Sequence, residues 1–135
     1  MNNNFFDKAR TNMVNNQLLP NGVKNSDLID SFDNTKKELF IPETEKDIVY
    51  SDSDIMVVPK RYMIRTFILA KMFENCSFSK TDSVLLIGCL TGYSVAVLSN
   101  LVSYVFGVEN NKQIVDKANN LKSYWFCNEI IFYRK

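Results

Sequence analysis

The stretch SVLLIGCLTGYSVAVLSNLVSYVFGVE, residues 83–109, decides the fold of this 135-residue chain. Its first 26 positions carry no charge, although charged residues make up 23% of the whole sequence. A run of this length can cross a bilayer as a helix. A buried core segment and the wall of a cofactor site are the two other interpretations.

The period of the apolar residues changes inside this run. Residues 84–87 form a continuous apolar block that ends at Gly88, which is typical of a buried strand. Apolar residues then recur at helical spacing over 95–102, and residues 104–108 are again β-branched or aromatic. The polar residues and glycines between these blocks disfavour a membrane span. The run therefore predicts a strand, a glycine turn, a helix and a second strand.

The rest of the chain gives weaker signals of the same kinds. The predicted elements are a helix over about 3–17, a turn at 18–23, a short helix from Asn25 or Ser26 through Phe32, an extended piece that stops at 40–42, a mostly extended segment at 49–58, a turn at Pro59-Lys60, a helix over 64–73, a polar loop at 77–82, a helix through 114–121 and a strand at 129–133.

This order of elements predicts a single α/β domain over 1–135. A helical and irregular N-terminal region, 1–76, precedes a β-α-β-α-β segment, 77–135. Alternation of strands and helices favours a parallel sheet with right-handed crossovers.

Composition excludes several functions. The net charge is +1 and no basic block occurs, which argues against nucleic acid as a partner. The chain has no histidine, so Ser-His-Asp, Cys-His and His-metal chemistry are excluded within it. Its three cysteines are widely spaced and predict neither a metal site nor a disulfide framework. The polar start MNNNFFDKAR is unlike a signal peptide, so we expect a cytoplasmic protein.

The first strand of the predicted sheet ends at a candidate cofactor loop, GCLTGY. Ligands of open parallel sheets bind beyond the carboxyl ends of the strands, where the next helix offers free N–H groups. Glu109 ends the second strand, 21 residues after Gly88, and a carboxylate at about this spacing can bind ribose hydroxyls. Alternatively, Gly88 and Gly92 only turn the chain, and Glu109 is an exposed residue before a helix capped by Asn110. The spacing leaves both interpretations open.

Several collinear segments resemble the protein-L-isoaspartate O-methyltransferase family, and in particular its bacterial branch. Together they span nearly the whole chain. They are ARTNMVNNQLLPNGV (9–23), ELFIP (38–42), the Tyr50/Asp52 pair in VYSDSDI, RYMIRTFILAKM (61–72) and DSVLLIGCLTGYSVAVLSNL (82–101) leading into VFGVEN.

The resemblance implies a Rossmann-like fold that uses S-adenosylmethionine to methylate isoaspartyl carboxylates of damaged proteins. The N-terminal region would supply part of the substrate pocket. Glu109 would hold the ribose, and no catalytic residue is assigned. The other cofactor-binding residues would be Gly88, Cys89, Leu90, Thr91, Gly92 and Tyr93.

The sequence departs from the family pattern at three positions. Leu86 replaces an acidic residue, Leu90 replaces the middle glycine of the loop, and Thr66 replaces a proline. A leucine at position 90 would crowd the methionine end of the cofactor, so we expect a degenerate loop. Thr66 is available as a substrate-side hydroxyl, although a place in the first turn of a helix is the favoured interpretation.

The sheet of the family continues beyond a third strand, so we expect a fold truncated after that strand. The block 84–87 would then lie at a sheet edge, which favours a homo-oligomer. We expect isoaspartyl methyl transfer with weak or lost activity. The alternative is a non-catalytic relative that serves as a binding or interaction module, or a decayed gene product.

Overall fold

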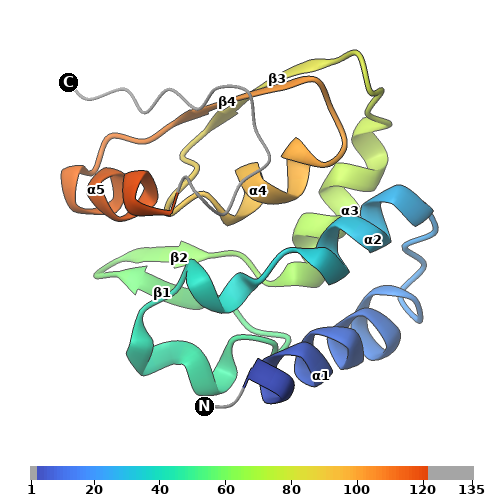
Figure 1. Cartoon of the computed structure of the whole chain (residues 1–135), viewed down its shortest axis with the longest axis horizontal. Coiled ribbons are helices and arrows are strands. Elements are labelled where there is room, and N and C mark those ends of the chain that lie inside the picture. The colour runs from blue at the N-terminus through green and yellow to red at the C-terminus, as the bar shows by residue number, and fades with distance from the viewer. Residues whose placement is uncertain (1–2, 122–135) are drawn as a thin grey trace. The chain divides into compact units, whose positions relative to one another are not determined.

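The computed structural model describes residues 3–121 of the chain (Figure 1). The chain divides into two compact units, with the boundary between Ser77 and Phe78. We refer to them as the N-terminal unit and the C-terminal unit and describe each by itself.

The N-terminal unit is built from helices, short helical turns and one hairpin (Figure 1). Its elements are the α-helix α1 (Asn3–Met13), the π-helical turn η1 (Val14–Leu18), α2 (Ser26–Asn34), the 3₁₀ turns η2 (Lys37–Leu39) and η3 (Glu43–Ile48), the strands β1 (Ile55–Val58) and β2 (Arg61–Met63), and α3 (Thr66–Cys76).

The predicted helices of this unit are confirmed, and local capping explains one of them. The side chain of Asn25 accepts a hydrogen bond from the Leu28 amide at 3.0 Å, so Asn25 is the N-cap of α2. Gly22 in the turn before α2 has φ +79°, which glycine adopts at low cost. Phe32 of α2 and Phe73 of α3 stack in the core with ring centroids 6.4 Å apart.

Two predictions for the middle of this unit are wrong. The extended piece expected to stop at 40–42 is instead the 3₁₀ turn η2, followed by Pro42 as the N-cap of η3. The segment expected to be extended over 49–58 forms a strand only from Ile55, which pairs with Met63 in an antiparallel hairpin. The turn predicted at Pro59-Lys60 is present, with φ +65° at Lys60.

The C-terminal unit contains the predicted βαβ arrangement (Figure 1). Strand β3 (Ser83–Ile87) pairs in parallel with β4 (Tyr104–Val108), in register from the Ser83–Tyr104 pair to the Ile87–Val108 pair. Helix α4 (Tyr93–Ser99) connects the two strands, and α5 (Lys112–Asn120) follows β4. The helix predicted to run through Val102 is shorter, because α4 ends at Ser99 with Asn100 as its C-cap.

One face of this two-stranded sheet packs on α4. A Cβ atom added at Gly107 of β4 would lie 3.0 Å from Cys89 Sγ and 3.2 Å from Val95 Cγ2, so these two side chains would have to shift to admit one. On the opposite face, Leu85 and Ile87 are 61% and 79% exposed. The expectation of a strand buried on both faces is therefore wrong for this side of β3.

The strand predicted at 129–133 lies outside the described residues. Within residues 3–121, no helix is both long and apolar enough to span a membrane.

Candidate cofactor site

The loop between β3 and α4 follows an unusual backbone path. Gly88, Leu90 and Gly92 have φ values of +77°, +52° and +97°, in the left-handed region that favours glycine. The amides of Gly88 and Cys89 both donate to the Val108 carbonyl, at 2.7 and 3.2 Å. The start of the loop is thereby fixed to the end of β4.

Glu109 directly follows β4, and its side chain contacts the loop. Its carboxylate is 1% exposed and accepts three backbone hydrogen bonds. Oε2 accepts from the Leu90 amide at 3.1 Å, and Oε1 accepts from the amides of Asn110 and Asn111 at 2.9 and 3.0 Å. This geometry agrees with the sequence interpretation in which Glu109 lies at the glycine loop. The alternative of an exposed Glu109 is wrong, and the N-cap of α5 is Asn111, not Asn110.

The other predicted site residues differ in accessibility. Gly88 is exposed, and no atom lies within 4 Å of the place where a Cβ would project. Cys89, Thr91 and Tyr93 are buried, with exposed fractions of 4%, 2% and 1%. Leu90 is partly buried. The exposed part of the loop is therefore its backbone at Gly88, and the neighbouring side chains pack inward.

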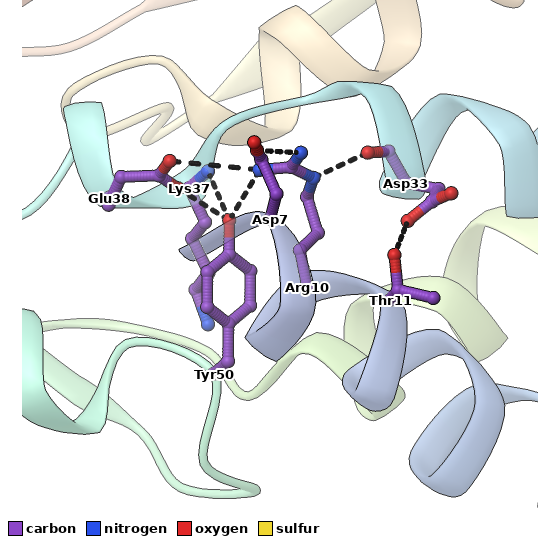
Figure 2. A network of polar contacts seen from close by, with 7 residues as sticks. All are labelled: Asp7, Arg10, Thr11, Asp33, Lys37, Glu38 and Tyr50. Atoms are coloured by element: carbon purple, nitrogen blue, oxygen red, sulfur yellow. Dashed lines mark hydrogen bonds and ion pairs between the residues drawn. The ribbon is translucent and has the colours of Figure 1, made fainter. Parts of the chain in front are cut away.

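A second cluster of polar residues lies in the N-terminal unit (Figure 2). The Tyr50 hydroxyl donates to Glu38 Oε2 at 2.5 Å and accepts from Arg10 Nη1 at 3.4 Å. Burial and the bond to Glu38 raise the pKa of Tyr50. Burial opposes the charged form of Arg10, but hydrogen bonds to Tyr50 and Asp7 outweigh it and raise the pKa of this guanidinium.

Lys37 occupies the interior of the same unit. It is 0% exposed, and its Nζ donates to Thr66 Oγ1 at 2.9 Å. Burial lowers the pKa of Lys37 to about 8, against the opposing charges of Asp54 and Asp52. Thr66 is 1% exposed and is the first residue of α3, so its interpretation as a helix-start residue is confirmed.

Sequence reasoning missed the buried charges Arg10, Lys37 and Glu38. Arg10 and Glu38 stand inside two of the segments that carry the family resemblance, yet their burial was not expected. The sequence did contain a signal for the burial of Arg10. This residue recurs at helical spacing with the apolar residues Phe6 and Met13, which places it on the buried face of the helix.

The arrangement in the C-terminal unit defines a class of protein. Parallel strands, a glycine turn and an acidic residue after the second strand are typical of α/β folds that bind a nucleotide-containing cofactor. Among the described residues, no group of His, Cys, Asp and Glu could hold a metal ion.

Comparison with known proteins narrows this class. The sequence profile described as Protein-L-isoaspartate(D-aspartate) O-methyltransferase (PCMT) matches residues 9–131, so the chain belongs to this family. The protein-L-isoaspartate O-methyltransferase 1 of Syntrophobacter fumaroxidans is 30% identical over 114 residues, which are 84% of this chain and 53% of that protein. The corresponding protein of Geobacter metallireducens is 32% identical over 113 residues, covering 84% and 52%.

Solved structures agree on the fold. A protein-L-isoaspartate O-methyltransferase structure superposes with a TM-score of 0.77 at 24% identity, covering 93% of this chain and 41% of that one. A putative enzyme of this type from Plasmodium falciparum, in complex with S-adenosyl-L-homocysteine, gives 0.72 at 16% identity, covering 93% and 62%. The fold is thus an α/β methyltransferase fold. The chain spans about half the length of the curated relatives it matches.

Proposed function

We propose that the protein binds S-adenosylmethionine at the 88–93 loop and transfers its methyl group to isoaspartyl carboxylates of proteins. Membership of the family supports the reaction class. The single observation that carries the site is the approach of Glu109 to the loop, where Oε2 lies 3.1 Å from the Leu90 amide nitrogen. The Plasmodium relative was solved with the demethylated form of this cofactor.

This reaction suits a chain without histidine. The acceptor carboxylate is already ionised at neutral pH, so attack on a sulfonium methyl group requires no general base. The protein has to align the two reactants and exclude water. Supplying the activated methyl group is the role of the cofactor.

A second candidate is a non-catalytic relative that acts as a binding module, and Glu109 itself favours it. An ionised carboxylate offers about four acceptor positions, and three of them hold backbone amides here. A ribose diol that donates twice would have to displace one of these amides. Leu90 adds a side chain at the loop position where the family places glycine.

Calorimetric titration with S-adenosylmethionine separates the two candidates. We expect binding to the wild-type chain and at least tenfold weaker binding to Glu109→Ala, because a hydrogen-bonded charge contributes about 1.5–3 kcal/mol. Circular dichroism would first establish that both proteins are folded. A folded wild-type chain that takes up no cofactor would contradict the proposal, and a methylation assay on an isoaspartyl peptide would follow a positive result.

The proposal also covers the partners of the protein and its location in the cell. Isoaspartyl proteins are the substrates it requires, and a second copy of the chain is a partner suggested by the exposed apolar side chains of β3. The location that we propose is a reducing cytoplasm, in keeping with Cys76, which is an exposed thiol.

A further inference from the structure

The turn between η1 and α2 contains Asn21, the one asparagine in the sequence that is followed by glycine. Pro20 and Asn21 are the central residues of this turn, which the Gly22 amide closes by donating to the Leu19 carbonyl at 3.1 Å. Proline at the first central position and glycine at the last position are typical of a type I turn. Asn21 is exposed, and the proposed function assigns it no role.

An asparagine followed by glycine loses ammonia without an enzyme. The backbone nitrogen of the glycine gives up its proton and attacks the side-chain carbonyl carbon of the asparagine. A new C–N bond closes a succinimide ring, and the side-chain nitrogen leaves as ammonia. Water then opens the ring at either carbonyl, which gives an aspartyl residue or an isoaspartyl residue. Glycine permits the attack most readily because it has no Cβ next to the attacking nitrogen.

Two other asparagines make the same local contact but are not followed by glycine. The side chains of Asn21, Asn34 and Asn75 are exposed, and each donates to the carbonyl four residues earlier, at 2.7, 2.8 and 2.8 Å. Thr35 and Cys76 follow the second and the third of them. These two asparagines also belong to α2 and α3, whose backbone hydrogen bonds oppose ring closure. We therefore expect Asn21 to be the reactive one of the three.

The backbone at Gly22 is open to the water that the reaction requires. Gly22 is partly exposed with φ +79°, and no atom lies within 4 Å of the place where a Cβ would project. Its N–H is bonded to the Leu19 carbonyl, so the turn has to open before the nitrogen can attack. Exposed turns open at a small fraction of the cost of global unfolding. The folded protein should therefore react, although more slowly than the unfolded chain.

We propose that Asn21 is a site of spontaneous deamidation, at which the protein acquires an aspartyl or isoaspartyl residue as it ages. The product no longer donates to the Gln17 carbonyl, because an ionised carboxylate only accepts hydrogen bonds. An isoaspartyl residue also adds a carbon atom to the backbone between Leu18 and Val23, which are 0% and 2% exposed. The modification therefore loosens the connection between η1 and α2. The proposal does not depend on methyl transfer.

The test follows the three asparagines in the whole chain by mass spectrometry. The folded protein is incubated at neutral pH without S-adenosylmethionine, and its tryptic peptides 11–24, 25–36 and 72–80 are compared with synthetic aspartyl and isoaspartyl standards. We expect Asn21 to form both products at least about tenfold faster than Asn34 and Asn75, which is a difference of about 1.4 kcal/mol in activation free energy. Conversion of Asn21 at the rate of the other two, or no conversion, would overturn the proposal.

The variant Gly22→Ala tests the role of glycine. It adds a Cβ where no atom lies within 4 Å, and it should slow the conversion of Asn21 at least about tenfold. Ser26→Ala changes an exposed residue of α2 beyond the turn and should leave the rate unchanged. In urea, where the fold has no influence, Asn21 should still react faster than Asn34 and Asn75. Equal rates for the two variants, or equal rates of the three asparagines in urea, would overturn the assignment to the Asn-Gly pair.

The modified protein tests the structural consequence. Ion-exchange chromatography isolates it, because deamidation adds a negative charge. We expect the isoaspartyl form to unfold at a lower urea concentration than Asn21→Asp, in which the backbone keeps its length. Equal unfolding midpoints for the isoaspartyl form and the wild-type chain would contradict the loosening of the turn. No step of this experiment involves the cofactor, so failure of this proposal is distinguishable from failure of the proposed function.

Discussion

Leu90 has a left-handed backbone conformation, with φ +52°, in the middle of the candidate cofactor loop. This conformation costs a residue with a side chain roughly 1–2 kcal/mol. We expect Leu90→Gly to raise the free energy of unfolding by about 1 kcal/mol and to strengthen binding of S-adenosylhomocysteine, since it also removes the leucine side chain from the loop. Urea unfolding and calorimetric titration would measure the two effects.

Lys60 provides the control for this prediction. It has φ +65° in the β1–β2 hairpin of the other unit. Lys60→Gly should therefore relieve similar strain, while leaving cofactor affinity unchanged. If Leu90→Gly stabilises the protein but does not improve affinity, the leucine side chain is no obstacle to the cofactor.

Lys37 predicts an unusual pH dependence. Its pKa falls from 10.5 to about 8 on burial, so between these values the unfolded chain binds more protons than the folded one. Stability therefore rises with pH across this window, by up to about 3 kcal/mol. Tyr50 acts in the opposite sense above pH 10, because burial raises its pKa and the unfolded chain ionises first.

Urea unfolding at pH 7, 8, 9 and 10 would test this dependence. We expect the wild-type free energy of unfolding to rise between pH 8 and 10, and we expect Lys37→Met to abolish that rise. Lys36→Met, at the exposed neighbouring position, should retain it. A wild-type curve that stays flat would mean that the folded chain keeps Lys37 protonated in this range.

Residue spacing left two interpretations of Glu109 open, and the family resemblance favoured the one in which Glu109 meets the glycine loop. Neither argument predicted that three backbone amides donate hydrogen bonds to the Glu109 carboxylate. These hydrogen bonds depend on the positive φ of Leu90 and on the turn at Asn110 and Asn111. The sequence pattern contains no signal for either. The side-chain oxygen of Gln17, which has no hydrogen-bond donor among the described residues, was not predicted either, because the sequence pattern indicated an ordinary helix over about 3–17 and not a π-helical turn.

At the scale of elements, Glu74 of α3 holds the connection that leads into α2. Its carboxylate accepts from the backbone amides of Lys24 and Asn25 and pairs with Lys71 at 3.0 Å. The amide of Lys24, the ion pair and the amide of Asn25 lower the pKa of Glu74 to about 2. The stability that this charge contributes is complete above pH 4.5 and is lost as the pH falls towards 2.

Acid unfolding measures this contribution. We expect Glu74→Gln to be less stable than the wild-type chain above pH 4.5 and equally stable near pH 2. Glu43→Gln is the control, because Glu43 also pairs with a lysine three residues away but is 85% exposed. Exposed pairs contribute little. A constant difference between Glu74→Gln and the wild-type chain across this range would show that the charge is not responsible.

The success of sequence-based prediction differed between elements for physical reasons. Helix α2 was predictable because Asn25 supplies a local cap. The 3₁₀ turn η2 was not, because Lys37 and Glu38 are held there by contacts with Thr66 and Tyr50, which are distant in sequence. The C-terminus of α4 was misplaced because Leu101 and Val102 remain buried after the helix has ended, which preserves the apolar pattern.

At the scale of the whole molecule, the sheet of the C-terminal unit presents apolar side chains to solvent. Leu85, Ile87 and Tyr104 are 61%, 79% and 45% exposed, and β4 is the one neighbour of β3 within residues 3–121. Burial of such a surface is worth about 25 cal/mol per Å². We therefore expect self-association, visible in sedimentation velocity as a sedimentation coefficient that increases with protein concentration.

A charge within this surface should prevent the association. Ile87→Lys adds a lysine to an edge strand, which is the means by which natural proteins block strand pairing. Met72→Lys is the matched control, because Met72 is also an exposed apolar residue, at 55%, but lies on α3. If Met72→Lys associates and Ile87→Lys does not, the contact involves β3. A wild-type chain that remains monomeric at every concentration would contradict the prediction, and the exposed face would then require a partner other than a second copy.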